Sequence, residues 1–318
     1  MKTKIIFRWP VLFKLWEEHP SIWKAMINIG ILLKYKTLKI DKLPKKVTFP
    51  SSTYIYVNPN ENRGRAILLT GGITQNRLFK FWSKSVQECS PDLIIDVGVN
   101  YGECIFSTIY PEHSRIYGIE ANHYLLGYIK KSKEAHPNQA QMTIINALAS
   151  DKVEGQKVFY IDQHWSGTSS ASYQPSHNMI EKVSVSTVTI DSLFDDITCK
   201  TVLFKVDVEG YEAFVLRGMK NLLMNCESSI GFIEFNSDYI KQSGVSAEGF
   251  FSFLQKNFRI YIYLEDDTLL QANQMDFSHL QNTLGTKYIH TDFILVAGKE
   301  VLDVKKHFSS ELDFKYTW

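Results

Sequence analysis

A glycine-bearing turn is the first feature of this sequence that suits the binding of a ligand. The apolar run 93–98 ends at Gly98, and Asn100 and Gly102 follow at alternate positions. Glycines in such a turn let backbone N–H groups approach a ligand closely. The next apolar run ends at Glu120. In α/β folds that bind nucleosides, an acid about 20 residues after the turn accepts hydrogen bonds from both ribose hydroxyls. The spacing therefore predicts a site for a ribose-containing ligand.

Four nearby residues extend this predicted site. Asp96 precedes the turn, and we expect its carboxylate to hold the turn through backbone N–H groups, with an ordinary capping role left open. Asn100 stands where dinucleotide-binding turns carry a glycine, which argues against a dinucleotide because a pyrophosphate needs a very close backbone approach there. Asn122 is expected to support the loop after Glu120. Ala147 ends a third apolar run, where such folds hold an adenine or simply turn.

Alternating charges follow a later apolar run, at Lys205, Asp207 and Glu209. In an extended strand these side chains project to the same side. Charges at the carboxyl end of a buried strand are costly unless they are paired or used, and ligands of open α/β sheets bind at that edge. A structural salt bridge between Lys205 and an acid stays open. Glu234 and Asn236 close the next strand, and we expect them beside Asp207 as substrate-binding groups; a magnesium ion there is a less favoured interpretation.

Strands and helices alternate around these residues, which predicts an α/β fold with a mostly parallel sheet and helices on both faces. The last two of its seven strands are expected to form an antiparallel pair. Two further strands, over 157–161 and 182–188, flank a polar loop rich in serine. Helices are expected over 102–110, 123–135, 211–223 and 247–257. The seven strands are expected over 93–98, 115–120, 142–147, 201–207, 229–235, 259–264 and 291–297.

The pattern divides the chain into four segments. Residues 1–46 form a basic helical arm that is broken at two prolines. A lead-in over 47–90 is expected to hold short strands as far as residue 72 and then a helix. The main α/β domain spans 91–300, and 301–318 form a C-terminal tail.

Three ordered motifs carry a family resemblance: D-V-G-x-N-x-G from Asp96, E-A-N from Glu120 and K-x-D-V-E-G-x-E from Lys205. They resemble the FkbM family of S-adenosylmethionine-dependent methyltransferases, from roughly residue 54 to residue 298. The resemblance implies a Rossmann-like class I methyltransferase domain with S-adenosylmethionine as its cofactor. It also implies O-methylation in glycan or natural-product biosynthesis, and a sugar of a surface polysaccharide is the acceptor that we favour.

Transfer of an activated methyl group to a hydroxyl requires an aligned nucleophile and a base. Asp207 is the first candidate for the base, at a position that also touches the cofactor site. His164, in the loop 162–167, is the second because a histidine titrates near neutral pH. Lys205 is included among the catalytic residues through its place in the motif. Trp165 either stacks on a sugar face or packs the loop.

Two other functions stay open. An NAD-dependent oxidoreductase or sugar epimerase is disfavoured by Asn100 and by the lack of a Tyr-x-x-x-Lys pair near the fourth strand. A non-catalytic binding protein on a methyltransferase scaffold is disfavoured by the intact glycine turn, Glu120 and Asp207.

The net charge and the cysteine content indicate which binding partners and which cellular location to expect. The net charge of +1 gives no drive toward nucleic acid. The four cysteines are widely spaced, which favours neither a zinc site nor a disulfide framework and points to the cytoplasm. The N-terminus lacks the pattern of a secretory signal, and no apolar stretch is long enough to span a bilayer. The cysteines are Cys89, Cys104, Cys199 and Cys226.

The basic charge is concentrated in the N-terminal arm. Residues 1–50 hold eleven Lys and Arg but three Asp and Glu, which leaves 24 basic and 31 acidic residues in the remainder. We expect the apolar stripe of the arm to dock on its own domain or on a second subunit, which predicts a homo-oligomer. Peripheral contact of residues 1–40 with the inner membrane surface is the alternative. The stripe comprises Trp9, Leu12, Phe13, Leu15, Trp16, Ile22, Trp23, Met26, Ile27 and Ile31.

Overall fold

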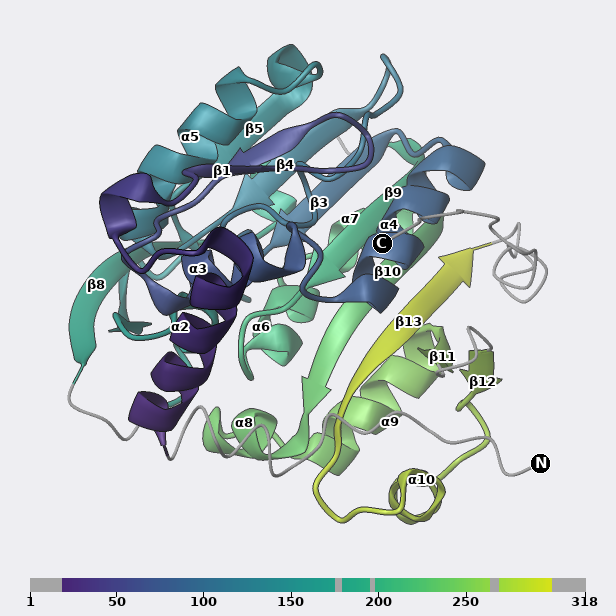
Figure 1. Ribbon diagram of the computed structural model, residues 1–318. Coiled ribbons are helices and arrows are strands. Elements are labelled where there is room, and N and C mark those ends of the chain that lie inside the picture. The colour runs from purple at the N-terminus through teal and green to yellow at the C-terminus, as the bar shows by residue number, and fades with distance from the viewer. Residues whose placement is uncertain (1–18, 175–178, 195–197, 264–268, 299–318) are drawn as a thin grey trace.

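A twisted eight-stranded sheet forms the centre of the molecule (Figure 1). The computed structural model describes residues 19–174, 179–194, 198–263 and 269–298, so the predicted tail and the first half of the arm lie outside the described residues. The strand order is β12-β11-β13-β10-β9-β3-β4-β5. The strands are β3 (Leu93–Val97), β4 (Arg115–Ile119), β5 (Met142–Ile145), β9 (Cys199–Val206), β10 (Cys226–Asn236), β11 (Arg259–Tyr263), β12 (Leu269–Gln271) and β13 (His290–Gly298).

The topology confirms the predicted sheet. The five strands from β5 to β10 pair in parallel, and β13 lies antiparallel between β10 and β11. All seven predicted strands are present, and the three-residue β12 adds an eighth at the edge beside β11. Parallel pairing brings the carboxyl ends of β3, β4, β9 and β10 to one edge, where the predicted site residues lie.

Helices cover both faces of the sheet, because successive residues of the buried strands point to opposite faces. In β3, Ile94 joins a core with Phe81 and Trp82, whereas Ile95 joins a second core with Val215 and Phe251. The helices are α2 (Pro20–Tyr35), α3 (Asn62–Thr70), α4 (Asn76–Cys89), α5 (Leu126–Glu134), α6 (Glu212–Arg217), α7 (Lys220–Asn225), α8 (Ser237–Gln242), α9 (Ala247–Asn257) and α10 (Phe277–Leu284).

The lead-in differs from the prediction in its second half. Strands β1 (Lys46–Thr48) and β2 (Tyr54–Tyr56) pair antiparallel, as expected. Residues 62–70, which were expected as strand, form α3. Glu61 caps this helix by accepting hydrogen bonds from the first backbone N–H groups, and Gly71 ends it in the left-handed conformation with φ of 66°.

The predicted helix over 102–110 is wrong, because this segment forms a series of turns. Three successive carbonyl oxygens of the segment accept hydrogen bonds from hydroxyl groups. The Ile105 carbonyl accepts from Tyr110, and the next two carbonyls accept from the hydroxyls of Thr53 and Ser51. Pro111 lacks the N–H that would bond the Ser107 carbonyl in a helix.

The two strands predicted around the serine-rich loop are confirmed as β7 (Gln156–Asp162) and β8 (Ile180–Val188), which pair antiparallel. Strand β6 (Leu148–Ala149) pairs with β8 in parallel, and the three form a small second sheet beside the carboxyl edge of the main one. The loop from β7 toward β8 thereby reaches the predicted site.

The expectation that the cysteines form no disulfide is wrong for one pair. Cys199 and Cys226 are disulfide-bonded, and their Cα atoms lie 4.8 Å apart. They are far apart in sequence, but they are register partners at the start of the parallel strands β9 and β10. Cys89 and Cys104 are free thiols. The spacing of the cysteines in the sequence indicated a cytoplasmic location. Because one pair forms a disulfide, the cysteines no longer support that location. Among the described residues, no helix is long and apolar enough to cross a membrane.

We expect Cys199→Ser/Cys226→Ser to lower the free energy of unfolding by about 3 kcal/mol, because the bond constrains the unfolded chain. Urea titration of the oxidised protein measures this effect, with Cys89→Ser as the control for loss of a free thiol. Thiol titration of unreduced, denatured wild-type protein should find two reactive thiols; four would show that the bond is absent.

Candidate functional site

A cavity lies at the carboxyl ends of β3, β4, β9 and β10, and we call it the central cavity. Its wall holds residues from the glycine turn, from the charged end of β9 and from the loop after β7, which we call the inserted loop. Five predicted residues, Asp96, Gly102, Asn122, His164 and Asn236, do not line it. The predicted residues that do line it are Gly98, Asn100, Glu120, Ala147, Trp165, Lys205, Asp207, Glu209 and Glu234.

The glycine turn requires glycine because two strand ends meet there. Gly98 has φ of 78°, and a Cβ atom at this position would lie 2.0 Å from the backbone oxygen of Asp207. Asn100 also takes the left-handed conformation, with φ of 51°. Its amide oxygen accepts a hydrogen bond from the Tyr101 N–H at 2.9 Å, which fixes the side chain over the turn. Gly98 and Asn100 both line the cavity.

Glu120 joins the glycine turn to the loop after β4. One carboxylate oxygen accepts a hydrogen bond from the Asn100 N–H and the other from the Asn122 N–H, both at 2.7 Å. Burial raises the pKa of Glu120, and these two N–H groups oppose the rise. Each carboxylate oxygen has a second lone pair, so Glu120 can also accept from a ligand in the cavity.

Lys205 links the end of β9 to the end of β3. Its ammonium donates to the Gly98 carbonyl at 2.8 Å and forms ion pairs with Asp96 at 3.2 Å and Asp207 at 3.8 Å. Burial lowers the pKa of Lys205, but the two carboxylates outweigh burial and the net pKa lies above its ordinary value. The amine therefore stays charged and cannot act as a base. The salt bridge that the sequence left open is the observed arrangement.

Three carboxylates form what we call the acidic end of the cavity: Asp207, Glu209 and Glu234. Each offers an oxygen atom that lies within 4.8 Å of the others. Glu209 holds the left-handed conformation with φ of 53°, and its carbonyl accepts a hydrogen bond from Ser170 at 2.8 Å. Glu234 is buried and forms an ion pair or hydrogen bond with His290 at 2.8 Å. The acidic end can accept several hydrogen bonds from a polyhydroxylated molecule.

A fourth acid, Glu212, organises the loop behind the acidic end. It is fully buried, and one carboxylate oxygen accepts the N–H groups of Val208 and Gly210 at 3.1 and 3.0 Å. Burial, together with the nearby charge of Glu234, raises the pKa of Glu212 to about 8. The loop that presents Glu209 thus depends on a buried carboxyl group.

The inserted loop is folded around Asp162. Its carboxylate accepts the N–H groups of His164 and Trp165 at 2.7 and 2.9 Å and the hydroxyl of Thr168 at 2.6 Å. Trp165 reaches the cavity wall. His164 does not: it is buried and contacts the Asn62 amide at 3.2 Å. Its predicted part in catalysis has no support from this position, because the ring packs behind the wall.

Glu61 connects three parts of the site. Besides capping α3, its carboxylate accepts the Tyr101 hydroxyl and the Ser166 N–H, both at 3.0 Å. Burial raises the pKa of Glu61, and the N–H of Ser166 is the strongest opposing group. The lead-in, the glycine turn and the inserted loop are therefore held together by one side chain. No role in the site was predicted for Glu61 from the sequence.

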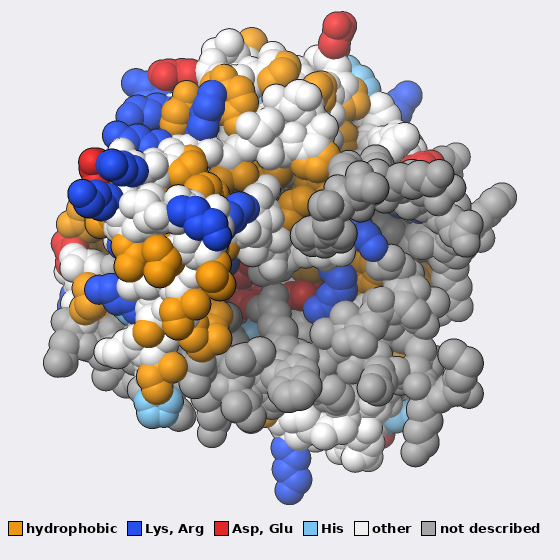
Figure 2. Space-filling view, viewed as in Figure 1, with side chains coloured by type: hydrophobic (Ala, Val, Ile, Leu, Met, Phe, Trp, Pro, Cys, Tyr) orange, Lys and Arg blue, Asp and Glu red, His pale blue; other side chains and the backbone are white. Residues whose placement is uncertain are grey.

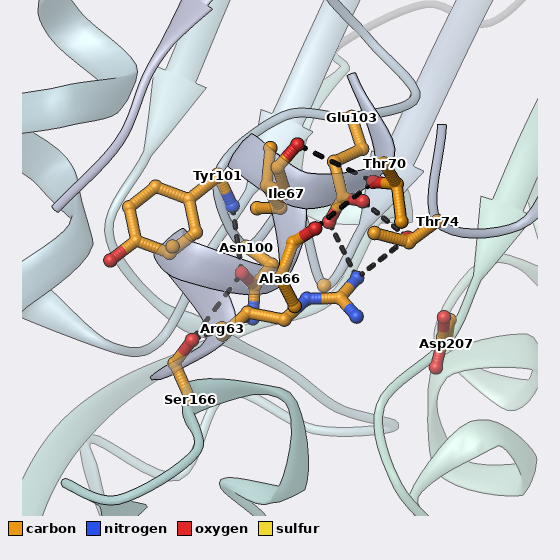
Figure 3. A network of polar contacts seen from close by, with 12 residues as sticks. Arg63, Ala66, Ile67, Thr70, Thr74, Asn100, Tyr101, Glu103, Ser166 and Asp207 are labelled. Atoms are coloured by element: carbon orange, nitrogen blue, oxygen red, sulfur yellow. Dashed lines mark hydrogen bonds and ion pairs between the residues drawn. The ribbon is translucent and has the colours of Figure 1, made fainter. Parts of the chain in front are cut away.

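A polar network at the opposite wall was also missed from the sequence. The Arg63 guanidinium pairs with Glu103 at 2.5 Å and donates to Thr74 at 3.2 Å, while Thr74 also hydrogen-bonds Glu103 (Figure 3). The guanidinium carbon lies 5.5 Å from the centre of the Trp165 ring. Asp207 stands apart from this network in the same view. Arg63 is the second residue of α3, in a segment that was expected from the sequence to be strand.

The remaining predicted residues support the wall from behind. Asp96 is fully buried, pairs with Lys205 and accepts the Ile105 N–H. Gly102 has φ of 91° and lies so close to the Phe106 ring that a Cβ would be 2.1 Å away. Asn122 caps the short helix that precedes α5, and Asn236 caps α8 through the Asp238 and Tyr239 N–H groups. Asn236 is thus a helix cap, whereas a substrate contact was predicted.

The fold and the cavity define a class I methyltransferase: a parallel sheet with one inserted antiparallel strand, and a ligand site at its carboxyl edge. Residues 96–266 match the protein family described as the methyltransferase FkbM domain. This match covers more than half of the chain, which therefore belongs to the FkbM methyltransferase family. Membership disfavours the oxidoreductase interpretation.

Several solved methyltransferase structures are similar at low sequence identity. The FkbM methyltransferase of Methylobacillus flagellatus KT is 10% identical, with a TM-score of 0.37 over 73% of this chain and 54% of that chain. The O-methyltransferase of Bacillus cereus, in complex with SAH, is 9% identical, with a TM-score of 0.40 over 71% and 82%. TomG of Streptomyces achromogenes, an O-methyltransferase of tomaymycin synthesis in complex with SAM, is 9% identical, with a TM-score of 0.38 over 71% and 82%. No curated protein matches the sequence.

We expect Glu212→Gln to flatten the pH dependence of stability. The folded pKa of about 8 lies above the ordinary value of 4.5, so the folded state binds the proton more tightly. Wild-type stability is therefore lost as the pH rises from 4.5 through about 8, by at most ~1.4 kcal/mol per pH unit from this group. Urea unfolding at a series of pH values measures the difference between variant and wild type. Glu112→Gln, at an exposed site, is the control, and an unchanged slope in Glu212→Gln would contradict the assignment.

Proposed function

We propose that this protein transfers a methyl group from S-adenosylmethionine to a hydroxyl of a sugar in polysaccharide or glycan biosynthesis. Family membership supports methyl transfer. The observation that carries the finer assignment is the layout of the central cavity, which has an open glycine turn with Glu120 in one wall and the acidic end in another.

The glycine turn suits the nucleoside and amino-acid parts of S-adenosylmethionine. Gly98 lines the cavity with backbone atoms alone, and Glu120 offers lone pairs to ribose hydroxyls. Ala147 and its neighbour Leu148 form an apolar patch of wall that suits an adenine. When bound, this cofactor supplies a methyl group on a positively charged sulfur. The carboxylates of the cavity favour such a cation.

The acidic end suits the acceptor. Carboxylates accept hydrogen bonds from neighbouring hydroxyls, and a sugar presents several in fixed geometry. An acceptor carrying phosphate would be repelled, since Asp207, Glu209 and Glu234 bring three negative charges together. Trp165 is buried and contacts Arg63 and Trp23, so its ring packs the loop and is little exposed to a sugar.

We assign Asp207, at the acidic end of the cavity, as the group that takes the proton of the acceptor hydroxyl. The Asp207 carboxylate would take the hydroxyl proton as the acceptor oxygen bonds the methyl group that the cofactor would supply, and the sulfur of the cofactor would keep the electron pair of the broken bond. The neighbouring ammonium of Lys205, 3.8 Å away, orients this carboxylate. Alignment of the acceptor by the acidic end accounts for the rest of the rate, because methyl transfer from a sulfonium needs little further chemistry.

Glu120→Ala should weaken binding of the demethylated cofactor, S-adenosylhomocysteine, by roughly 1–3 kcal/mol, the scale of lost charge-assisted hydrogen bonds. Titration calorimetry measures the change, and wild-type protein should show no heat with NAD. Glu120→Gln separates ribose contact from loop support, since it keeps one acceptor for a backbone N–H. Glu112→Ala is the exposed control. Wild-type affinity in Glu120→Ala would refute the ribose assignment.

Asp207→Asn should lower turnover by about 100-fold or more while S-adenosylhomocysteine still binds, since it removes the base and keeps the shape. Methylation is followed by mass spectrometry with a panel of neutral sugars and oligosaccharides, and with polyketide and peptide hydroxyl compounds as competing acceptors. Methylation confined to the non-sugar acceptors would overturn the proposed acceptor class.

Two controls accompany the Asp207 experiment. His164→Ala should keep turnover, because His164 lies behind the wall; if it alone abolishes turnover, the base is in the inserted loop. A chelator should leave turnover unchanged, as substrate binding by the acidic end needs no metal. Loss of activity with the chelator, restored by magnesium, would instead make Asp207, Glu209 and Glu234 metal ligands.

A further inference from the structure

Helix α2 has two apolar faces, and only one of them docks on the protein. The docked face carries Ile27 and Ile31, which are buried against α3. Gly30 allows close approach, since a Cβ there would lie 2.9 Å from Leu69. Lys34 donates to the Leu68 and Leu69 carbonyls at 2.9 Å, which fixes the end of the helix. This part of the arm thus docks on its own domain, as expected.

The second face of α2 is exposed. Ile22, Met26, Ile29 and Leu33 recur at intervals of four, three and four residues, which places them in one stripe. Between 46% and 66% of each side chain is accessible. Within the described residues, six of the thirteen exposed large hydrophobic side chains lie between residues 22 and 38. Such a concentration is unusual for a surface that faces only water.

Lysines surround this stripe. Seven lysines and one aspartate lie between residues 19 and 46. Lys24, Lys39, Lys42, Lys45 and Lys46 are exposed. Figure 2 shows the hydrophobic side chains gathered over the position of α2 with Lys and Arg side chains next to them. An apolar stripe bordered by lysines complements a surface that is anionic outside and apolar beneath.

We propose that α2 and the lysines that follow it bind the surface of an anionic phospholipid bilayer. The stripe from Ile22 to Leu33 enters the boundary between headgroups and acyl chains, and the lysines contact the phosphates. A second copy of the chain is a poorer occupant, because a two-fold interface would place the lysines of one subunit opposite those of the other. The charge pattern therefore reverses our sequence-based preference for a homo-oligomer on this face.

Helix α2 also contacts the wall of the central cavity. Trp23, on the docked side of α2, contacts Trp165 edge-on, with ring centres 5.8 Å apart, and Trp165 lines the cavity. If the proposed sugar methylation holds, this arrangement suits an acceptor presented at the membrane surface. Membrane binding itself does not depend on that function, and it can be measured without any substrate.

Vesicle co-sedimentation tests the proposal with the full chain. We expect binding to vesicles of phosphatidylcholine mixed with phosphatidylglycerol, weakened by added salt, and little binding to phosphatidylcholine alone. Ile29→Glu/Leu33→Glu, on the exposed stripe, should reduce binding by about tenfold or more. Val153→Glu/Met224→Glu is the matched control, because it adds the same charge at equally exposed apolar positions elsewhere. Lys39→Glu/Lys42→Glu should lower binding by about tenfold or more as well.

Calorimetry with S-adenosylhomocysteine shows whether each variant is folded, since the substitutions lie on exposed side chains away from the cavity. The proposal is overturned if wild-type protein ignores anionic vesicles, or if the stripe and control variants bind them equally. It is also overturned if light scattering shows a lipid-independent dimer that Ile29→Glu/Leu33→Glu converts to a monomer, since a second copy would then cover the stripe. Loss of methyl transfer with vesicle binding intact would count against the proposed function alone.

Discussion

The buried ammonium of Lys205 is the interaction on which the site depends. A buried charge is costly unless partners surround it, and here Asp96 and Asp207 lie on either side while the Gly98 carbonyl accepts a hydrogen bond. These partners come from the ends of β3 and β9, which the ammonium holds in register. The glycine turn and the first residue of the acidic end therefore keep a fixed separation. The two strand ends can lie this close together because Gly98 has no side chain to collide with the Asp207 backbone.

Around Lys205 and its partners, buried acidic side chains hold the loops of the cavity wall in place. Glu61, Glu120, Asp162 and Glu212 each accept two or more backbone N–H groups, and each fixes a different loop. A carboxylate is well suited to this role because charge-assisted hydrogen bonds are stronger than neutral ones. The loops of the wall are consequently rigid, and the negative charge of the wall comes mainly from Glu120, Asp207, Glu209 and Glu234. A cationic cofactor and a polyhydroxylated acceptor fit such a wall better than an anionic ligand does.

The sequence predicted the parts of this structure that depend on local patterns. Apolar runs located all seven main strands, and the spacing from Gly98 to Glu120 brought two real cavity residues together. Prediction from the sequence failed where the local structure depends on a contact with a residue that is distant in the sequence. Residues 102–110 are turns because Thr53 and Ser51 donate to their carbonyls, and the Cys199–Cys226 bond follows from the register of β9 and β10. His290 reaches Glu234 only through the antiparallel pairing of β13, and Glu61 serves loops that lie up to 105 residues away.

The left-handed backbone at Asn100 and Glu209 has a consequence for how this chain can change. Side chains other than glycine are disfavoured in that conformation by roughly 1 kcal/mol each, somewhat less for asparagine. Both residues lie in the cavity wall, one in the glycine turn and one at the acidic end. Selection for stability alone would favour glycine at both positions and would erase the side chains that face the ligand. At these two positions a substitution that relieves backbone strain would also remove a side chain from the cavity wall, so a gain in stability and a loss at the site would come together.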